Sequence, residues 1–216
     1  ISVYPPAAPM TVVDPRYVYL GNGDDILINT GWINGAAEGQ AGNDTLQNLP
    51  QAAAGDLGGA GGSDLVINQG YVGVLMNGSY QQPDGDLLGG DDNDTVLNAA
   101  FAYVNVNMDG GHGDDSVLNQ GYVAGHIGGG YGSDTVINAQ GARAESMHGD
   151  YEYNPADTLY PPSVVAPGDD LMINAGVLAG TLVGIFDSQP RYALGTMDGF
   201  GGSDTLINTA GAVAGR

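Results

Sequence analysis

The stretches Gly113-Asp-Asp-Ser-Val-Leu-Asn119 and Gly132-Ser-Asp-Thr-Val-Ile-Asn138 share one pattern of turn residues, apolar residues and a final Asn. It occurs eight times, with Asp92 once replacing the Gly and Gln47 once replacing an apolar residue. The Asp of each copy is Asp25, Asp44, Asp64, Asp94, Asp115, Asp134, Asp170 or Asp204. Successive Asp residues are 19, 20, 30, 21, 19, 36 and 34 residues apart. The chain is therefore a repeat of about 20 residues with three insertions.

The length of the repeat predicts the fold. About 20 residues are too few for a helical hairpin but fit one coil of a β-solenoid, in which each coil contacts only its neighbours. The Gly and the polar residue before each Asp predict a tight turn, and the residues up to the Asn predict a strand. A second strand is expected after the Asn, for example over residues 121–127. We predict an all-β fold: one parallel β-solenoid of eight to nine coils over residues 21–216, preceded by a Pro- and Tyr-rich cap or assembly segment over residues 1–20.

Both residues before each Asn are apolar in seven of the eight copies. Because side chains alternate between the two faces of a strand, one file must fill the solenoid interior and the other must point outward. An exposed aliphatic stripe of this length is unusual for a monomer. We therefore expect the 1–20 segment, the inserted loops or a neighbouring molecule to cover it.

Composition excludes two kinds of partner. The 216 residues carry 25 acidic side chains against four Arg and no Lys, which gives a net charge of −21. Nucleic acids and anionic membrane surfaces need clustered basic residues, so neither is an expected partner. The sequence contains no Cys, which excludes a disulfide framework, and no run of 18 apolar residues that would predict a membrane-spanning helix.

Two turns carry a recognisable motif. Gly110–Leu118 and Gly129–Ile137 match the nonapeptide Gly-Gly-x-Gly-x-Asp-x-U-x, where U is a large apolar residue. In these turns the chain resembles the calcium-binding RTX β-rolls of bacterial secreted proteins. In its Asn-x-Gly-x-Val-x-Gly spacing it is similar to autotransporter-like adhesin passengers. The resemblance implies an extracellular or cell-surface protein, with Ca²⁺ as cofactor and one file of metal ligands: Asp25, Asp44, Asp64, Asp94, Asp115, Asp134, Asp170 and Asp204.

The residues leave two roles open for these Asp side chains. Ca²⁺ takes six to eight oxygen ligands, which two stacked turns together can supply. Alternatively, each Asp caps its turn by accepting backbone N–H bonds, with no ion. For the eight Asn residues we expect a structural role, in which stacked side-chain amides hydrogen-bond along a file.

The three insertions, Ser79–Leu88, Asp150–Ala166 and approximately Thr181–Gly195, are expected on one side of the solenoid. Aromatic side chains in loops stiffened by Pro suit contact with a sugar or a protein. The alternative is that these loops fold over the apolar stripe. The candidate binding residues are Tyr80, Tyr151, Tyr153, Tyr160, Phe186 and Tyr192.

No catalytic residues are predicted. His112, His126 and His148 are 14 and 22 residues apart, which is not metal-ligand spacing, so each is expected to be a lone solvated side chain. No polar capping unit follows the last repeat, so we expect this end to meet another subunit or to continue in a longer protein. The predicted function is an extracellular structural solenoid that self-associates into a filament, sheath or surface layer. An adhesin segment that binds a glycan or a host protein is the alternative, and a polysaccharide-active enzyme is a remote one.

Overall fold

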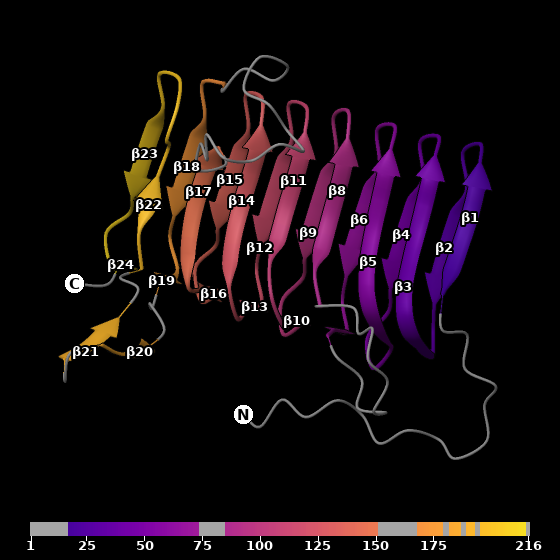
Figure 1. Ribbon diagram of the computed structural model, residues 1–216, viewed down its shortest axis with the longest axis horizontal. Helices are drawn as coiled ribbons and strands as arrows, with labels where there is room; N and C mark the ends of the chain where they lie inside the picture. Colours follow the sequence, from indigo (N-terminus) through magenta and orange to yellow (C-terminus); the bar gives the residue numbers. More distant parts are fainter. Residues whose placement is uncertain are drawn as a thin grey trace.

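The computed structural model describes residues 17–73, 85–150, 168–178, 182–186, 189–192 and 195–214. Throughout these residues the regular secondary structure is β, and no helix capable of crossing a membrane occurs among them. The strands pair in parallel except in one hairpin, β20 (Leu182–Phe186) with β21 (Gln189–Tyr192). Successive coils lie side by side in chain order along the longest axis of the molecule (Figure 1). The predicted parallel β-solenoid is confirmed.

The repeated Asp-to-Asn segments form one eight-stranded sheet. In spatial and chain order its strands are β2 (Ile26–Asn29), β4 (Thr45–Asn48), β6 (Leu65–Asn68), β9 (Thr95–Asn98), β12 (Ser116–Asn119), β15 (Thr135–Asn138), β18 (Leu171–Asn174) and β23 (Thr205–Asn208). Equivalent residues of the repeats pair directly, as in Asn119 with Asn138. The insertions between repeats therefore do not shift the register.

The opposite sheet has 14 strands, because each coil contributes a second and a third segment to it. The segments that precede the turn are β1 (Val18–Asn22), β3 (Trp32–Ala41), β5 (Ala53–Gly61), β8 (Leu87–Asp91), β11 (Met108–His112), β14 (His126–Tyr131), β17 (Ser146–Asp150) and β22 (Met197–Asp198). The short segments that follow the Asn are β7 (Tyr71–Val72), β10 (Tyr103–Val104), β13 (Tyr122–Val123), β16 (Arg143–Ala144), β19 (Val177–Leu178) and β24 (Val213–Ala214). In the first coils the two segments run together as one strand, β3 or β5.

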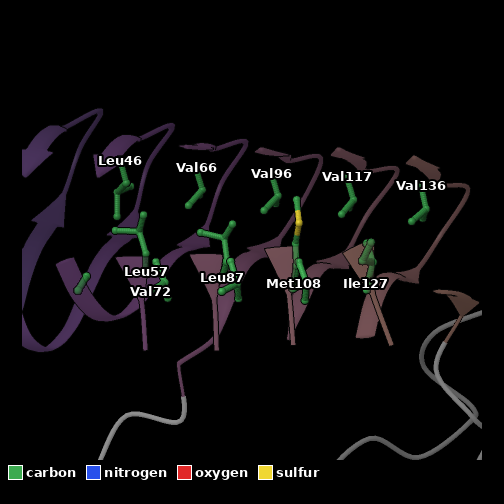
Figure 2. Close-up of a cluster of buried hydrophobic side chains, with 14 of the residues drawn as sticks. Leu46, Leu57, Val66, Val72, Leu87, Val96, Met108, Val117, Ile127 and Val136 are labelled. Atoms are coloured by element: carbon green, nitrogen blue, oxygen red, sulfur yellow. The ribbon is translucent and has the colours of Figure 1, made fainter. Parts of the chain in front are cut away.

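The core lies between the two sheets. Val66, Val96 and Val117 point inward from the eight-stranded sheet and meet Leu87 and Met108 from the other (Figure 2). These side chains are fully buried. The first apolar residue of each pair before the Asn is thus the inward one, and the second faces outward.

The insertions differ from the prediction in two respects. Leu87 and Leu88 belong to β8, and Leu87 is a core residue, so the first insertion ends before them. The first and third insertions connect a short second strand to a third strand, whereas the middle one connects β17 to β18 at the turn. The middle insertion therefore leaves the solenoid at a different corner from the other two. The spacing of the repeats did not show this, because the sequence predicted a single strand after the Asn where the structure has a second and a third strand.

Candidate functional site: the aspartate turns

The eight repeated Asp residues form a continuous ladder along the turn corner. Each backbone N–H donates to Oδ1 of the Asp in the next coil, at 2.7 Å from Asp64 to Asp94 and 2.8 Å from Asp115 to Asp134. Seven such bonds join the eight residues from Asp25 to Asp204. The carboxylates therefore accept backbone N–H bonds, as the capping alternative requires, but they do so between coils rather than within one turn.

The polar residue that precedes each Asp makes a second ladder in the opposite direction. The N–H of Ser133 donates to Oδ1 of Asp114 in the preceding coil at 2.9 Å, and the N–H of Ser203 donates to Asp169 at 2.7 Å. This explains why the position holds Asp, Asn or Ser, each of which has a side-chain acceptor. Most neighbouring turns are consequently linked in both directions.

The second carboxylate oxygen of the ladder is buried without a hydrogen-bond partner. This is true of Oδ2 in Asp44, Asp64, Asp94, Asp115, Asp134 and Asp170. These residues are at most 4% exposed. Each Oδ2 packs against a Gly of the third strand, for example that of Asp115 against Gly110, where a Cβ would lie 2.5 Å from it. A buried carboxylate oxygen without a partner strongly disfavours the ionised form.

The ladder carboxyls accordingly have raised pKa values. The pKa of Asp94 and Asp134 rises from 3.8 to about 8, mainly because of burial; neighbouring carboxylates add to this rise and the backbone hydrogen bond partly opposes it. By the same causes the pKa of Asp64 rises to about 6. Burial and the charge of Asp170 raise the pKa of Asp150, a buried carboxyl at the end of β17, to about 7. The corner thus concentrates groups that bind protons near neutral pH.

The predicted calcium ligands are therefore brought together as one file. Their unpartnered Oδ2 atoms are hard oxygen donors, the type that Ca²⁺ prefers. Within the described part of the chain, however, no three His, Asp or Glu side chains are grouped closely enough to hold a metal ion. An ion at this corner would need main-chain carbonyls for most of its shell. Calcium binding by the file stays a prediction.

The Asn residues have the structural role expected for them. Nδ2 of Asn119 donates to Oδ1 of Asn138 at 3.0 Å, and this bond recurs between successive coils from Asn29 to Asn208. Nδ2 of Asn119 also donates to the carbonyl of Arg143 at 3.1 Å, and its Oδ1 accepts the N–H of Gly121. The amides therefore satisfy the buried main-chain groups of the second corner.

An aromatic stack on the 14-stranded sheet was not predicted. The rings of Tyr71, Tyr103 and Tyr122 are parallel and 5.1 Å apart, and Arg143 covers Tyr122 at 5.8 Å from its centroid. Both faces of the Tyr103 ring are therefore covered by neighbouring rings, so this ring is not available to stack on a sugar. The aligned Tyr-Val dipeptides of these second strands were the available signal.

The histidines are not the lone solvated residues predicted from their spacing. His112 forms a 2.7 Å contact with Asp91 and lies against Tyr131. The rings of His126 and His148 lie 5.4 Å apart at 78°. In a solenoid, residues separated by about one repeat become neighbours, so a spacing of 22 residues is a contact spacing.

The outer face of the eight-stranded sheet carries no charge. Two outward positions per strand form two columns, one mostly Thr or Leu and the other mostly Ile or Leu, and no described strand packs on them. Ile28 is 56% exposed and Leu65 is 36% exposed. The columns are Ile26, Thr45, Leu65, Thr95, Ser116, Thr135, Leu171 and Thr205, and Ile28, Gln47, Ile67, Leu97, Leu118, Ile137, Ile173 and Ile207. We call this surface the uncharged face.

The predicted binding loops cannot be placed. Tyr80, Tyr151, Tyr153 and Tyr160 lie outside the described residues, as does most of the 1–20 segment. For Phe186 and Tyr192, at the ends of β20 and β21, only the backbone is described. Glycan or protein binding by these residues remains a prediction.

A comparison with protein-family models, curated proteins and solved structures found no match.

Proposed function

We propose that this protein is an extracellular structural solenoid that self-associates side by side through the uncharged face into a filament, sheath or surface layer. The observation that carries the proposal is the placement of charge. A chain with a net charge of −21 keeps all its acidic side chains off sixteen outward positions of one sheet. Such a surface suits contact with a second copy, because charged residues are depleted at the centres of interfaces.

The size of the face sets the expected strength of the contact. Eight strands about 4.8 Å apart and four residues long cover roughly 34 by 13 Å. Two copies packed through it would bury roughly 900 Å² in total, below the roughly 1,200 Å² of a standard stable interface. A pair of molecules is therefore expected to associate weakly, and a longer assembly is expected where the copies are staggered, so that each face contacts two copies opposite it. Repulsion between the acidic chains should make association stronger at higher salt.

A single charge on the face should prevent association. We expect Leu118→Asp, at the centre of the uncharged face, to stay monomeric at concentrations where the unchanged protein associates. The matched control is Leu88→Asp, because Leu88 is also exposed, at 39%, but lies on the other sheet. Sedimentation velocity measures the size, and circular dichroism confirms that both variants fold. An unchanged protein that remains monomeric in high salt, or equal effects of the two substitutions, would contradict the proposal.

Ca²⁺ is proposed to stabilise the aspartate ladder when its carboxyls are ionised. At pH 8, chelation should lower the thermal midpoint and the β-sheet signal, and added Ca²⁺ should restore both. At pH 5 chelation should have little effect, because protons already neutralise the ladder. Identical melting curves with and without chelator at pH 8 would reduce the Asp residues to hydrogen-bond acceptors. The proposal of self-association does not depend on that result.

A further inference from the structure

The last described coil leaves the core open on its outer side. Leu206 of β23 holds the position that Val66 and Val117 hold in the inner coils, where these side chains are fully buried, yet Leu206 is 45% exposed. At the same position of the first described coil, Leu27 is only partly buried. Within the described residues no strand pairs with the outer edge of β2 or of β23. These two coils therefore lack the neighbour that every coil between them has.

The hydrogen-bonded ladders have a direction, so the two end coils differ. Among the described residues, the N–H of Asp204 has no acceptor, whereas Oδ1 of Asp25 has no donor. The Asn file runs the same way: Nδ2 of Asn208 has no acceptor there, and Oδ1 of Asn29 accepts only the N–H of Gly31. Each unused donor of the last coil thus matches an unused acceptor at the same position of the first coil.

We propose that the last described coil of one molecule stacks on the first described coil of a second copy, in the register of the repeat. In this arrangement β23 pairs with β2 of the second copy, and Leu206 packs against its Leu27. Asp204 donates to Asp25 of the second copy and continues the ladder. Because the contact joins two different surfaces and does not close on itself, it generates an open filament with a direction. It goes beyond the proposed side-by-side contact and does not rest on it, since the uncharged face stays free.

A single end contact is expected to be short-lived. The end of a coil measures roughly 33 by 10 Å, which is the length of a ten-residue strand such as β3 and the distance between two packed sheets. This area is smaller than the uncharged face, and two chains of net charge −21 repel each other. A covalent bond that traps the contact is therefore a sharper test than the equilibrium size.

Cysteine cross-linking can trap the contact, because the sequence contains no Cys of its own. Tyr19 and Asp198 are the first and last residues of one column on the outer face of the 14-stranded sheet, which also contains Leu88. In the proposed register Asp198 of one copy lies beside Tyr19 of the next, with Cα atoms about 4.8 Å apart, which a disulfide can span. Within one molecule the two positions lie at opposite ends of the column.

We expect the variant with Tyr19→Cys and Asp198→Cys to form linked dimers, trimers and longer chains under mild oxidation, resolved by electrophoresis without reductant. The matched control combines Tyr19→Cys with Leu88→Cys, because Leu88 is exposed in the same column but belongs to an inner coil. The control should give at least about tenfold fewer linked chains. No linked chains in the first variant, or equal amounts in both, would overturn the proposal.

A substitution at the last coil tests the ladder itself. Asn208→Asp keeps the Oδ1 that accepts from Asn174, but it removes the Nδ2 donor and adds a charge at the contact. Cross-linking of the Cys pair should then fall by about tenfold or more. Asn43→Asp is the matched control: it is exposed in an inner coil and keeps the Oδ1 that accepts the N–H of Ser63, so cross-linking should not change. Equal effects of the two substitutions would contradict the proposal.

Leu118→Asp separates this contact from the side-by-side one. Leu118 lies on the uncharged face, on the sheet opposite the Cys pair, so cross-linking should persist in this background. Loss of cross-linking there would assign the links to side-by-side contact and overturn the head-to-tail arrangement. Circular dichroism must show native β content in each variant.

Discussion

Raising the pH from 4 to 8 is expected to destabilise the solenoid by several kcal/mol in the absence of divalent cations. The cause is the aspartate ladder, whose buried Oδ2 atoms have no hydrogen-bond partner. Burial raises the pKa of Asp64 and Asp115 to about 6 and that of Asp94 and Asp134 to about 8. Each pKa unit corresponds to about 1.4 kcal/mol of stability. The carboxylates of Asp92, Asp114, Asp150 and Asp170 also oppose ionisation of the file.

The sign of the effect follows from proton binding. An Asp in the unfolded chain releases its proton near pH 3.8, whereas the same group in the solenoid holds it up to about pH 6 to 8. Between these values the folded state binds more protons than the unfolded state, so stability falls as pH rises. Below about pH 4 both states are protonated, and the ladder's contribution is fully present. Most proteins rich in ordinary carboxylates behave in the opposite way, because acid destabilises them.

Urea unfolding at several pH values, followed by circular dichroism in the presence of a chelator, checks this prediction. Asp94→Asn keeps an oxygen acceptor for the N–H of Asp64 but cannot ionise, so it should flatten part of the pH dependence and stabilise the protein at pH 8. Asp24→Asn is the control, since Asp24 is exposed and its ladder bond survives as an amide oxygen. A pH profile that is flat, or the same in all three proteins, would show that the file does not bind protons.

The second prediction with a large expected effect concerns a steric clash that lowers the stability of the fold. Gly59→Ala should destabilise the solenoid by about 2–3 kcal/mol or more, because its Cβ would collide with the buried carboxyl group of Asp64. Neighbouring Gly58 provides the matched control. A Cβ there meets only Leu88, at 3.8 Å, so Gly58→Ala should leave stability unchanged or raise it by up to about 1 kcal/mol.

Urea unfolding of the two variants at pH 5 tests this prediction by comparing their free energies of unfolding. At this pH the ladder carboxyls are protonated, so repulsion between carboxylates does not affect the comparison. Equal stabilities would mean that the third strand can move away from the carboxyl group. The glycine before each turn would then not be required by packing against the ladder.

The repeat pattern was enough to predict the features that recur at the same position in every coil. The Asp-to-Asn segments give the eight-stranded sheet, and their alternation predicted that one residue of each apolar pair is inward and the other outward; the structure shows that Val117 is the inward one and Leu118 the outward one. The Asn file was also predictable, because a polar residue at a fixed buried position must find partners, and its nearest equivalents lie one coil away.

Features that join different segments of neighbouring coils were not predicted. The contact of His126 with His148 depends on register in the third strand, where the repeat shows little sequence identity. Asp150 was assigned to an insertion, but it ends β17 and is buried, 3% exposed, near the ladder. Coil lengths between 19 and 36 residues hide such relations, because the second and third strands have to be aligned separately from the turns.

The direction of the hydrogen bonds has a mechanical consequence. In a parallel solenoid the bonds between strands point from coil to coil, so tension along the long axis acts equally on every interface between coils, and the weakest interface yields first. The final interface has the fewest supports: β17 and β22 pair through two residues, and the bond from Asp170 to Asp204 is 3.1 Å long, against 2.7 Å from Asp64 to Asp94. Under load, the described coils should therefore peel away from the β23 end, one at a time, while the central coils stay wound.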